Sequence, residues 1–537
     1  MTGPDRVFVN GVVRTMSAGE AAATAPTAVA CAAGRFVAVG TDAEILALAG
    51  DTAEVVDLGG ATVVPGFIET HLHPLMWGLM LAGVDATTRA CPTVDAVVAA
   101  LAARAAETPE GTLIEAWGFD DSLVAEDRGL TAQDLDRAST RHPIMVRHTS
   151  NHGIYLNSVA LAEAGVEAHT PDPEGGVIVR FEDGTPTGEL RELPAMSMFG
   201  GLMPSADLES ACRAMLRAQA EMAKVGVTSY HDLLVPAHLY PAYRRLDLDG
   251  RLQLRARLYL HADAADQLDD IGDATPHLEI GGVKLVSDGS IQLHTAALTE
   301  PYHDLGGCHC GEMAIASGDL DRLVAENHGA GRSVAIHTNG DRAIDLCLDA
   351  IEKARAAHPE QDVAHRLEHV QTLRDDQIRR MTELGVSASI FVNHVYYWGD
   401  RHRDRYLGPG RGERISPVAS VAAAGLPYAL HCDCPVTPVD PLFTMNTAVH
   451  RVTRDGHVLG AQERVSTRQA LAGYTSEAAR ITREDGVKGR IEPGLWADFV
   501  VLDGDPLTDP DQADPVGDLS ALHVLRTVVG GDTVYQA

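Results

Sequence analysis

Two histidines, His71 and His73, stand one residue apart in the segment Val63–Pro74. A β-strand places alternate residues on one face, so at a strand end both imidazoles would point the same way. Two imidazole nitrogens aimed at one point suit a divalent metal ion. The alternative is a chance pair, because the chain contains 24 histidines.

Further residues of metal-binding types follow strand-like runs later in the chain. His337 and His369 each close such a run, and Asp433 comes shortly after the apolar stretch Pro427–Leu430. In (β/α)8 barrels the active site lies at the carboxyl ends of the strands, so these side chains would converge there. One strand-end histidine is more often structural, but the whole set favours a metal site.

The middle of the chain alternates between helix-like and strand-like segments. Helices are predicted over Val94–Arg104, Asp207–Val225 and Leu320–Gly329. Strands are predicted over Ile144–His148, Val227–His231, Arg257–Leu260, Val283–Ser287, Ser333–His337, His365–Glu368 and Ser387–Ile390. Such alternation indicates an α/β fold with a parallel sheet surrounded by helices, here a (β/α)8 TIM-like barrel.

Both ends of the chain are rich in short strands instead. Asn10-Gly11 between two strand-like runs predicts a hairpin, and Thr527–Tyr535 predicts another. We expect residues 1–62 and 485–537 to form one small β-sandwich domain, and residues 63–484 to form the barrel. Proline, glycine and charged residues cluster within about residues 100–190, which predicts an insertion in the barrel there.

Composition excludes several classes of protein. The 537 residues exceed the roughly 250 of a barrel alone. A net charge of −32 argues against nucleic acid as a partner. There is no apolar run of about 18 residues for a membrane span and no apolar core of a signal peptide at the start. We expect a cytoplasmic protein with a small-molecule substrate, able to pair as a homodimer. Eight cysteines over this length do not indicate a disulfide framework.

The motifs together resemble those of the amidohydrolase superfamily of metal-dependent hydrolases. The similarity covers nearly the whole chain, and it is greatest to the branch of N-substituted formamide deformylases and their uncharacterised relatives. The shared features are Pro65-Gly66-Phe67-x-x-x-His71-x-His73, Gly226–Asp232, Lys284 within Gly282–Ser290, His337 with Asp341-Arg342, Glu368-His369, Asp433 and Gly494–Leu502. Glu69 departs from the pattern, because the family more often has aspartate there. Asp433 lies between two cysteines, where Ser-Asp is commoner.

The resemblance implies a set of metal ligands and one or two divalent ions per chain. His71 and His73 would hold the first ion, and His337 and His369 the second. Imidazole and carboxylate ligands suit zinc best, although iron, manganese and cobalt fit too. The full implied set is His71, His73, Lys284, His337, His369 and Asp433.

Lys284 and Asp433 are the implied catalytic residues. A buried lysine is readily neutral, and a neutral amine can take up carbon dioxide to form a carbamate that bridges two cations. An ordinary lysine paired with Asp288 is the alternative. Metal lowers the pKa of bound water to about 7. Asp433 would take the proton of that water and pass it to the leaving nitrogen of an amide.

This chemistry predicts hydrolysis of an amide-type carbon–nitrogen bond, with an N-substituted formamide or a similar small amide as substrate. The same fold could instead deaminate a heterocycle or hydrolyse a lactone or ester. A non-catalytic barrel that binds a small molecule is a further alternative. Release of amine, ammonia or acid separates the enzymatic alternatives.

Three residues are candidates for substrate binding. His148 lies in a segment that resembles the substrate side of this branch, and Tyr302 could line a loop over the site. Arg342 follows His337 by five residues and could pair with Asp341 to orient the ligands, or belong to a helix N-terminus.

Two Cys-x-Cys pairs, Cys308–Cys310 and Cys432–Cys434, remain unassigned. Four thiolates could bind a structural zinc ion, but zinc motifs space their cysteines by two to four residues. A thiol that lines the pocket and inert reduced cysteines are the other interpretations.

Overall fold

A computed structural model describes residues 4–17, 25–200, 207–262, 273–507 and 517–537. The chain divides into two compact units. The first comprises Met1–Leu72, Gln219–Asp433 and Val439–Ala537, and the second comprises His73–Ala218 and Cys434–Pro438.

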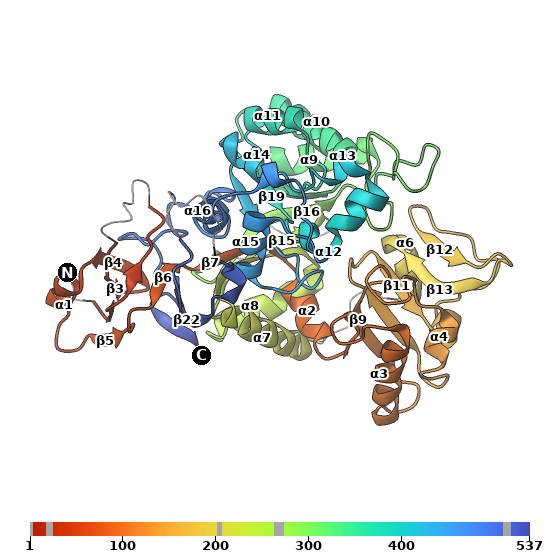
Figure 1. The fold of residues 1–537 in the computed structure, drawn as a ribbon, viewed down its shortest axis with the longest axis horizontal. Coiled ribbons are helices and arrows are strands. Elements are labelled where there is room, and N and C mark those ends of the chain that lie inside the picture. Colours follow the sequence, from red (N-terminus) through yellow and green to blue (C-terminus); the bar gives the residue numbers. More distant parts are fainter. Residues whose placement is uncertain (1–3, 18–24, 201–206, 263–272, 508–516) are drawn as a thin grey trace. The chain divides into compact units, whose positions relative to one another are not determined.

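The first unit contains an eight-stranded parallel sheet in the order β20-β19-β18-β17-β16-β15-β14-β7. Figure 1 labels four of these strands, β7, β15, β16 and β19. Six of these strands, β14 to β19, overlap segments predicted from the sequence. The α/β fold class with a TIM-like barrel is therefore confirmed. The strands are β7 Phe67–Leu72, β14 Val227–Val235, β15 Arg255–His261, β16 Leu278–Val286, β17 Val334–Thr338, β18 Arg366–His369, β19 Ser387–Ile390 and β20 Tyr428–Leu430.

Two consecutive carbonyl groups, those of Gly473 and Tyr474, accept backbone hydrogen bonds from the last and first strands of this sheet and hold the two strands together. Ile68 N, on β7, donates to Tyr474 O at 2.7 Å, and Leu430 N, on β20, donates to Gly473 O at 2.9 Å. Nearer the carboxyl ends, Asp433 N donates directly to His71 O at 3.0 Å. The residues that follow β20 are thus tied to the end of β7.

Helices alternate with the strands, as βαβ connections require. In α10, the buried residues Ile344, Cys347, Leu348 and Ile351 recur at the spacing of one helical face, which packs in the core of the barrel. The predicted helix Leu320–Gly329 is confirmed within α9. The helices of the barrel region are α7 Leu208–Lys224, α8 Tyr240–Leu248, α9 Ser317–Gly329, α10 Asp341–Ala357, α11 Asp375–Leu384, α12 His394–Arg401, α13 Pro409–Gly412, α14 Val418–Ala423, α15 Pro441–His450, α16 Thr467–Ala472 and α17 Ser476–Arg480.

Both termini contribute strands to a β-sandwich in the first unit, as the sequence predicts. One sheet has the order β4-β3-β1-β5 and the other the order β2-β6-β21-β22-β23. Phe8 and Phe499, from opposite ends of the chain, pack edge to face at 4.8 Å in its core. The elements are β1 Arg6–Val9, β2 Val12–Val13, β3 Ala28–Ala32, β4 Arg35–Gly40, α1 Asp42–Leu48, β5 Glu54–Asp57, β6 Thr62–Pro65, β21 Phe499–Leu502, β22 Val524–Val529 and β23 Asp532–Gln536.

One of the two predicted hairpins is wrong. The chain turns at Asn10, where φ is +60°, but β1 and β2 do not pair with each other. The two edges of β1 are taken by β3 and β5, so β2 crosses to the other sheet and pairs with β6. The C-terminal hairpin is confirmed: β22 and β23 are antiparallel, and Gly530 and Gly531 between them have positive φ.

The second unit has a six-stranded mixed sheet in the order β12-β13-β11-β10-β9-β8. The predicted strand Ile144–His148 is β10 and belongs to this sheet, not to the barrel, because its neighbours are β9 and β11. Two apolar clusters form its core. The elements are α2 Pro74–Met80, β8 Val84–Asp85, α3 Val94–Glu107, β9 Ile114–Phe119, α4 Ala132–Asp136, β10 Ile144–His148, β11 Gly153–Leu156, α5 Ser158–Glu163, β12 Val177–Arg180, β13 Pro186–Arg191 and α6 Glu192–Met196.

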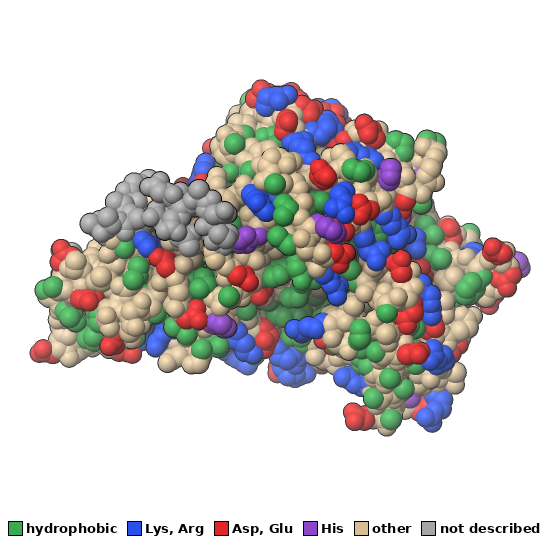
Figure 2. Space-filling model, in the orientation of Figure 1, with side chains coloured by type: hydrophobic (Ala, Val, Ile, Leu, Met, Phe, Trp, Pro, Cys, Tyr) green, Lys and Arg blue, Asp and Glu red, His purple; other side chains and the backbone are tan. Residues whose placement is uncertain are grey.

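The surface carries charges of both signs. On the face shown in Figure 2, acidic and basic side chains are interspersed, although the net charge of the chain is −32. Among the helices that the structure describes, none combines the length and the apolar character needed to cross a bilayer.

Candidate metal centre

His71 lies near the carboxyl end of β7 with its imidazole buried. Its Nδ1 is 2.7 Å from Glu368 Oε2, a charge-assisted hydrogen bond. Donation from Nδ1–H puts the lone pair of the neutral ring on Nε2. This Nε2 lies 3.4 Å from Asp433 Oδ1, so a potential nitrogen ligand and a potential oxygen ligand sit side by side.

Glu368 is itself held by Arg366, two residues earlier on β18 and therefore on the same face of the strand. Arg366 Nε is 2.7 Å from Glu368 Oε1. The guanidinium also donates to His231 Nδ1 on β14 and to Thr70 O on β7, both at 2.9 Å. All these groups are buried, so one cation ties three strands to the carboxylate that orients His71.

His369 ends β18 in a left-handed backbone conformation, with φ +69°. Such a conformation is costly for a residue with a side chain and often marks a functional position. Burial, and next the nearby His337, lowers the pKa of His369 well below its ordinary value, so the ring is neutral. A neutral imidazole is the form that binds a metal ion.

A further histidine, His431, contacts this ring. His369 Nδ1 is 3.2 Å from His431 Nε2, and His431 Nδ1 is 2.9 Å from Ser389 Oγ. The His431 ring also stacks on that of His71, with centroids 4.8 Å apart. The nitrogen ligand atoms of His71, His369 and His431 all lie within 4.8 Å of one another.

His337 lies on β17 with its ring centroid 4.5 Å from that of His369. Its Nε2 is 3.2 Å from Gly289 O and 3.1 Å from Asn339 Nδ2. The loop that carries Gly289 is fixed by Asp288, whose carboxylate accepts backbone N–H groups from Ala297, Asn339 and Gly340. Asp288, which the sequence offered as the alternative partner of Lys284, thus uses its carboxylate to hold the loops at the strand ends.

Lys284 lies on β16 and is buried, with 3% of its surface exposed. Among the described residues its Nζ has no hydrogen-bond partner. Burial lowers the pKa of Lys284 to about 8, while the carboxylates of Glu368 and Asp433 act in the opposite direction. An amine buried without a hydrogen bond is costly, so this position calls for a further group.

Asp433 follows β20 in a left-handed conformation, with φ +54°. Besides its approach to His71, its Oδ2 is 3.8 Å from His369 Nδ1. Glu69 holds this segment against β7, because it accepts hydrogen bonds from His71 N at 3.2 Å, Cys432 N at 3.3 Å and Tyr474 Oη at 3.0 Å. Burial raises the pKa of Glu69 to about 8.

The remaining predicted site residues lie as follows. His73 is the N-cap of α2 and the first residue of the second unit. His148, in the same unit, has Nε2 3.2 Å from Asp121 Oδ1 and Nδ1 2.7 Å from Ser150 Oγ. In the first unit, the Tyr302 hydroxyl donates to Ala296 O at 3.0 Å, and Arg342 Nη2 donates to Gly311 O at 3.0 Å. The role of His73 as a metal ligand stays a prediction, as do the roles of His148, Tyr302 and Arg342 in substrate binding.

The cysteines are all free thiols. Cys308 is exposed, Cys310 is partly exposed, and Cys432 and Cys434 are buried. Among the described residues, the groups that could hold a metal ion contain histidine and aspartate and no cysteine. The donor atoms that gather in the first unit are therefore imidazole nitrogens and carboxylate oxygens beside a buried amine, a set that fits a divalent transition metal.

Sequence reasoning did not find His431 or the roles of Glu368, Arg366 and Glu69. A signal for His431 was present, since it stands two residues before Asp433 directly after a short apolar strand, as His71 stands two before His73. The Arg366–Glu368 pair shows the same alternation on β18. What the sequence could not show is which strands lie beside one another.

Comparison with known proteins agrees with this geometry. A model of an amidohydrolase family matches residues 54–535. The chain is 30% identical to N-substituted formamide deformylase of Arthrobacter pascens over 99% of this chain and 98% of that protein. It is also 30% identical to Protein LONG AFTER FAR-RED 3 of Arabidopsis thaliana, over 94% and 87%.

Among solved structures, an uncharacterized metal-dependent hydrolase from Pyrococcus furiosus superposes with a TM-score of 0.74 at 25% identity, covering 94% of this chain and 100% of that one. Sequence, fold and the cluster of histidine and aspartate side chains that could hold a metal ion agree, and the chain belongs to the amidohydrolase family of metal-dependent hydrolases.

Proposed function

We propose that this protein is a zinc-dependent hydrolase of a small amide, with an N-substituted formamide as the substrate class. The observation that carries the proposal is the proximity of His71, His337, His369 and Asp433 at the carboxyl ends of the barrel strands. The buried Lys284 interacts electrostatically with His369 and Asp433. The similarity to a formamide deformylase over the full length supports the choice of bond.

The proposed ligands are His71, His73, His337, His369 and Asp433, with Lys284 as a carbamate. Bound divalent metal would supply a Lewis acid and a water molecule of lowered pKa. Glu368 favours the His71 tautomer that carries its proton on Nδ1 and its lone pair on Nε2, and His431 orients His369. Burial lowers the pKa of His369 well below its ordinary value, so this imidazole is neutral before any metal binds.

Asp433 is the proposed proton carrier. Its carboxylate lies beside His71 Nε2 and the Nδ1 of His369, so it can accept a proton from a water molecule held at that point. It would then return the proton to the nitrogen of the scissile bond, because an amine leaves readily only when protonated. The hydrogen bond from its own backbone N–H to His71 O keeps the carboxylate in place.

The test is to measure metal content and product together. We expect at least one zinc per chain in protein purified without chelator, and amine and formate from an N-substituted formamide. His71→Ala should lose metal and activity, whereas His523→Ala, at a side chain 76% exposed, should keep both. Release of ammonia from a heterocycle, or of acid from a lactone, with no turnover of formamides would refute the proposed substrate class.

A further inference from the structure

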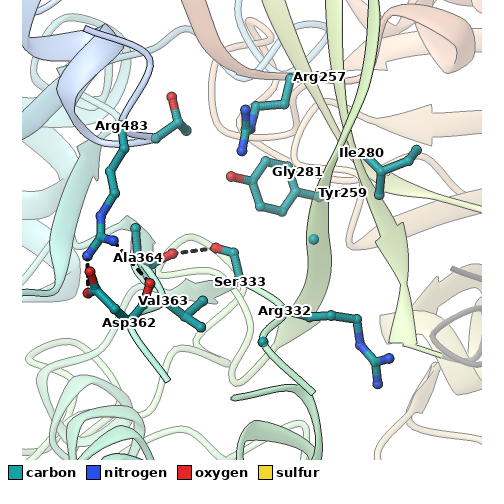
Figure 3. Close-up of a pocket in the computed structure, with 13 residues that line it drawn as sticks. Arg257, Tyr259, Ile280, Gly281, Arg332, Ser333, Asp362, Val363, Ala364 and Arg483 are labelled. Carbon is teal, nitrogen blue, oxygen red and sulfur yellow. Dashed lines mark hydrogen bonds and ion pairs between the residues drawn. The ribbon is translucent and has the colours of Figure 1, made fainter. Parts of the chain in front are cut away.

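The amino-terminal ends of the barrel strands surround a cavity of about 420 Å³ (Figure 3). Its lining includes Arg257 and Gly281 from the first half of β15 and β16, and Ser333 and Ala364 from the segments that lead into β17 and β18. The metal-centre residues occupy the other ends of the same strands. The cavity is therefore a separate feature of the first unit, at the opposite mouth of the barrel.

The side chains around this cavity carry an excess of positive charge. Three arginines line it, Arg257, Arg332 and Arg483, against a single acid, Asp362. Arg483 Nη2 pairs with Asp362 at 2.7 Å. Arg332 donates from Nε to the neutral amide oxygen of Asn327 at 3.0 Å, and no carboxylate among the described residues pairs with it.

Carboxylates that lie behind the residues lining the cavity do not cancel this excess of positive charge. Arg257 Nη1 lies 2.9 Å from Glu279 and 3.6 Å from Glu484. Glu484 is shared, because Lys488 Nζ lies 2.7 Å from its other oxygen. Four cations thus face three carboxylates, and the charge of Arg332 is left over.

The lining of the cavity also includes a hydrogen-bond donor that has no partner among the described residues. Arg257 Nε is buried and has no hydrogen-bond partner among the described residues. A Cβ on Gly281 would lie 2.8 Å from this Nε and 2.6 Å from the ring of Tyr259, so both side chains pack directly against the glycine and a larger residue would displace them. Figure 3 shows Arg257 and the Tyr259 hydroxyl on one side of the cavity, with Arg483 across from them.

Two basic groups beside the cavity, Arg355 and His365, have lowered pKa values. Burial lowers the pKa of Arg355, and Arg483 lowers it further. Burial lowers the pKa of His365 to about 3, and His328, Arg355 and Arg483 act in the same direction. Both groups are disfavoured in their charged forms, partly because other cations are already close.

We propose that this cavity binds a small oxyanion, a phosphate or carboxylate group held by Arg257 Nε, Arg332 and Arg483. Guanidinium groups offer paired N–H donors that match oxyanion geometry, and a desolvated guanidinium binds such groups strongly. In a chain of net charge −32, a pocket of opposite sign would select anions that the rest of the surface repels.

The experiment is calorimetric titration of the metal-loaded protein with inorganic phosphate at constant ionic strength. We expect one saturable site in the wild type. Arg483→Gln and Arg332→Gln should each weaken the affinity roughly 10- to 100-fold, the effect of losing a hydrogen bond to a charged group. The matched control is Arg480→Gln: Arg480 is 42% exposed, pairs with Glu477 and does not line the cavity, so its loss should leave the affinity unchanged.

Phosphate could also bind at the metal centre, so His71→Ala is titrated in parallel and should keep the site. Binding that is lost in His71→Ala but unchanged in Arg483→Gln and Arg332→Gln would overturn the proposal, as would absence of saturable binding in the wild type. Malonate then identifies the group: competition with phosphate shows that a carboxylate is accepted, and failure to compete assigns the site to phosphate.

Discussion

The imidazoles of His369 and His431 meet edge to edge, with Nδ1 of His369 3.2 Å from Nε2 of His431. The contact continues through His431 Nδ1 to Ser389 Oγ at 2.9 Å, and from there to Thr70 Oγ1 at 3.2 Å. These contacts fit two donor directions, and in one of them Nδ1–H of each histidine donates outward, towards Ser389. In that state His369 presents the lone pair of Nε2.

His431→Phe is expected to weaken metal binding roughly 10- to 100-fold, because loss of the partner that orients a metal-ligating histidine has effects of this size. Phenylalanine keeps a ring between His71 and Phe391 but removes the acceptor. Competition with a chelator measures the affinity, and exposed His523→Phe is the control. Equal affinity in His431→Phe and the wild type would show that His369 is oriented without this contact.

Asp433→Asn is expected to lower kcat by roughly 10² to 10⁴ while metal content stays near normal. The amide can still offer an oxygen to the metal but cannot accept the proton of water. The loss should appear in kcat more than in KM, because the proton moves only in the transition state. Cys432→Ser and Cys434→Ser are the neighbouring controls and should change kcat far less. A wild-type kcat in Asp433→Asn would contradict the proposed role.

The sequence was sufficient to predict the barrel and most of its strands, because alternating strand and helix patterns are local. It also placed His71, His337 and His369 at strand ends, where the structure has them. The hairpin predicted at Asn10-Gly11 was wrong for a related reason. The turn signal is local and the chain does turn there, but pairing of β1 with β3 and β5 depends on residues far along the sequence.

The supports of the metal centre could not be predicted, because each joins distant strands. Arg366 reaches His231 and Thr70, 135 and 296 residues away. Glu69 reaches Cys432 and Tyr474 across the seam of the sheet. Such contacts follow from which strands become neighbours in the sheet, and no spacing within one segment contains that information.

Lys284 is expected to carry a carbamate, since its buried Nζ has no hydrogen-bond partner among the described residues and its lowered pKa leaves a neutral fraction at neutral pH. Protein loaded with metal in the presence of ¹³C-bicarbonate should show one carbamate ¹³C resonance that is absent in Lys284→Arg. Exposed Lys353→Arg, which loses a lysine paired with Asp321, is the control and should keep the resonance. If the wild-type spectrum lacks this resonance, Lys284 does not carry a carbamate.

The folded protein should lose stability as pH falls below about 6.5, and His365 should account for part of that loss. Its ring is fully buried, accepts from Val334 N at 3.1 Å, and has its pKa lowered to about 3 by burial and by His328, Arg355 and Arg483. Between about pH 3 and 6.5 the unfolded chain therefore binds a proton at His365 that the folded chain does not, so stability falls as pH falls through this window. At pH 5 this difference in proton binding lowers the free energy of unfolding by about 2 kcal/mol, since one pKa unit corresponds to about 1.4 kcal/mol.

Urea unfolding of His365→Gln at pH 7 and pH 5 should show a smaller decrease in the free energy of unfolding than the wild type, while partly exposed His358→Gln should follow the wild type. If His365→Gln loses as much stability between the two pH values as the wild type does, His365 is not the group that titrates.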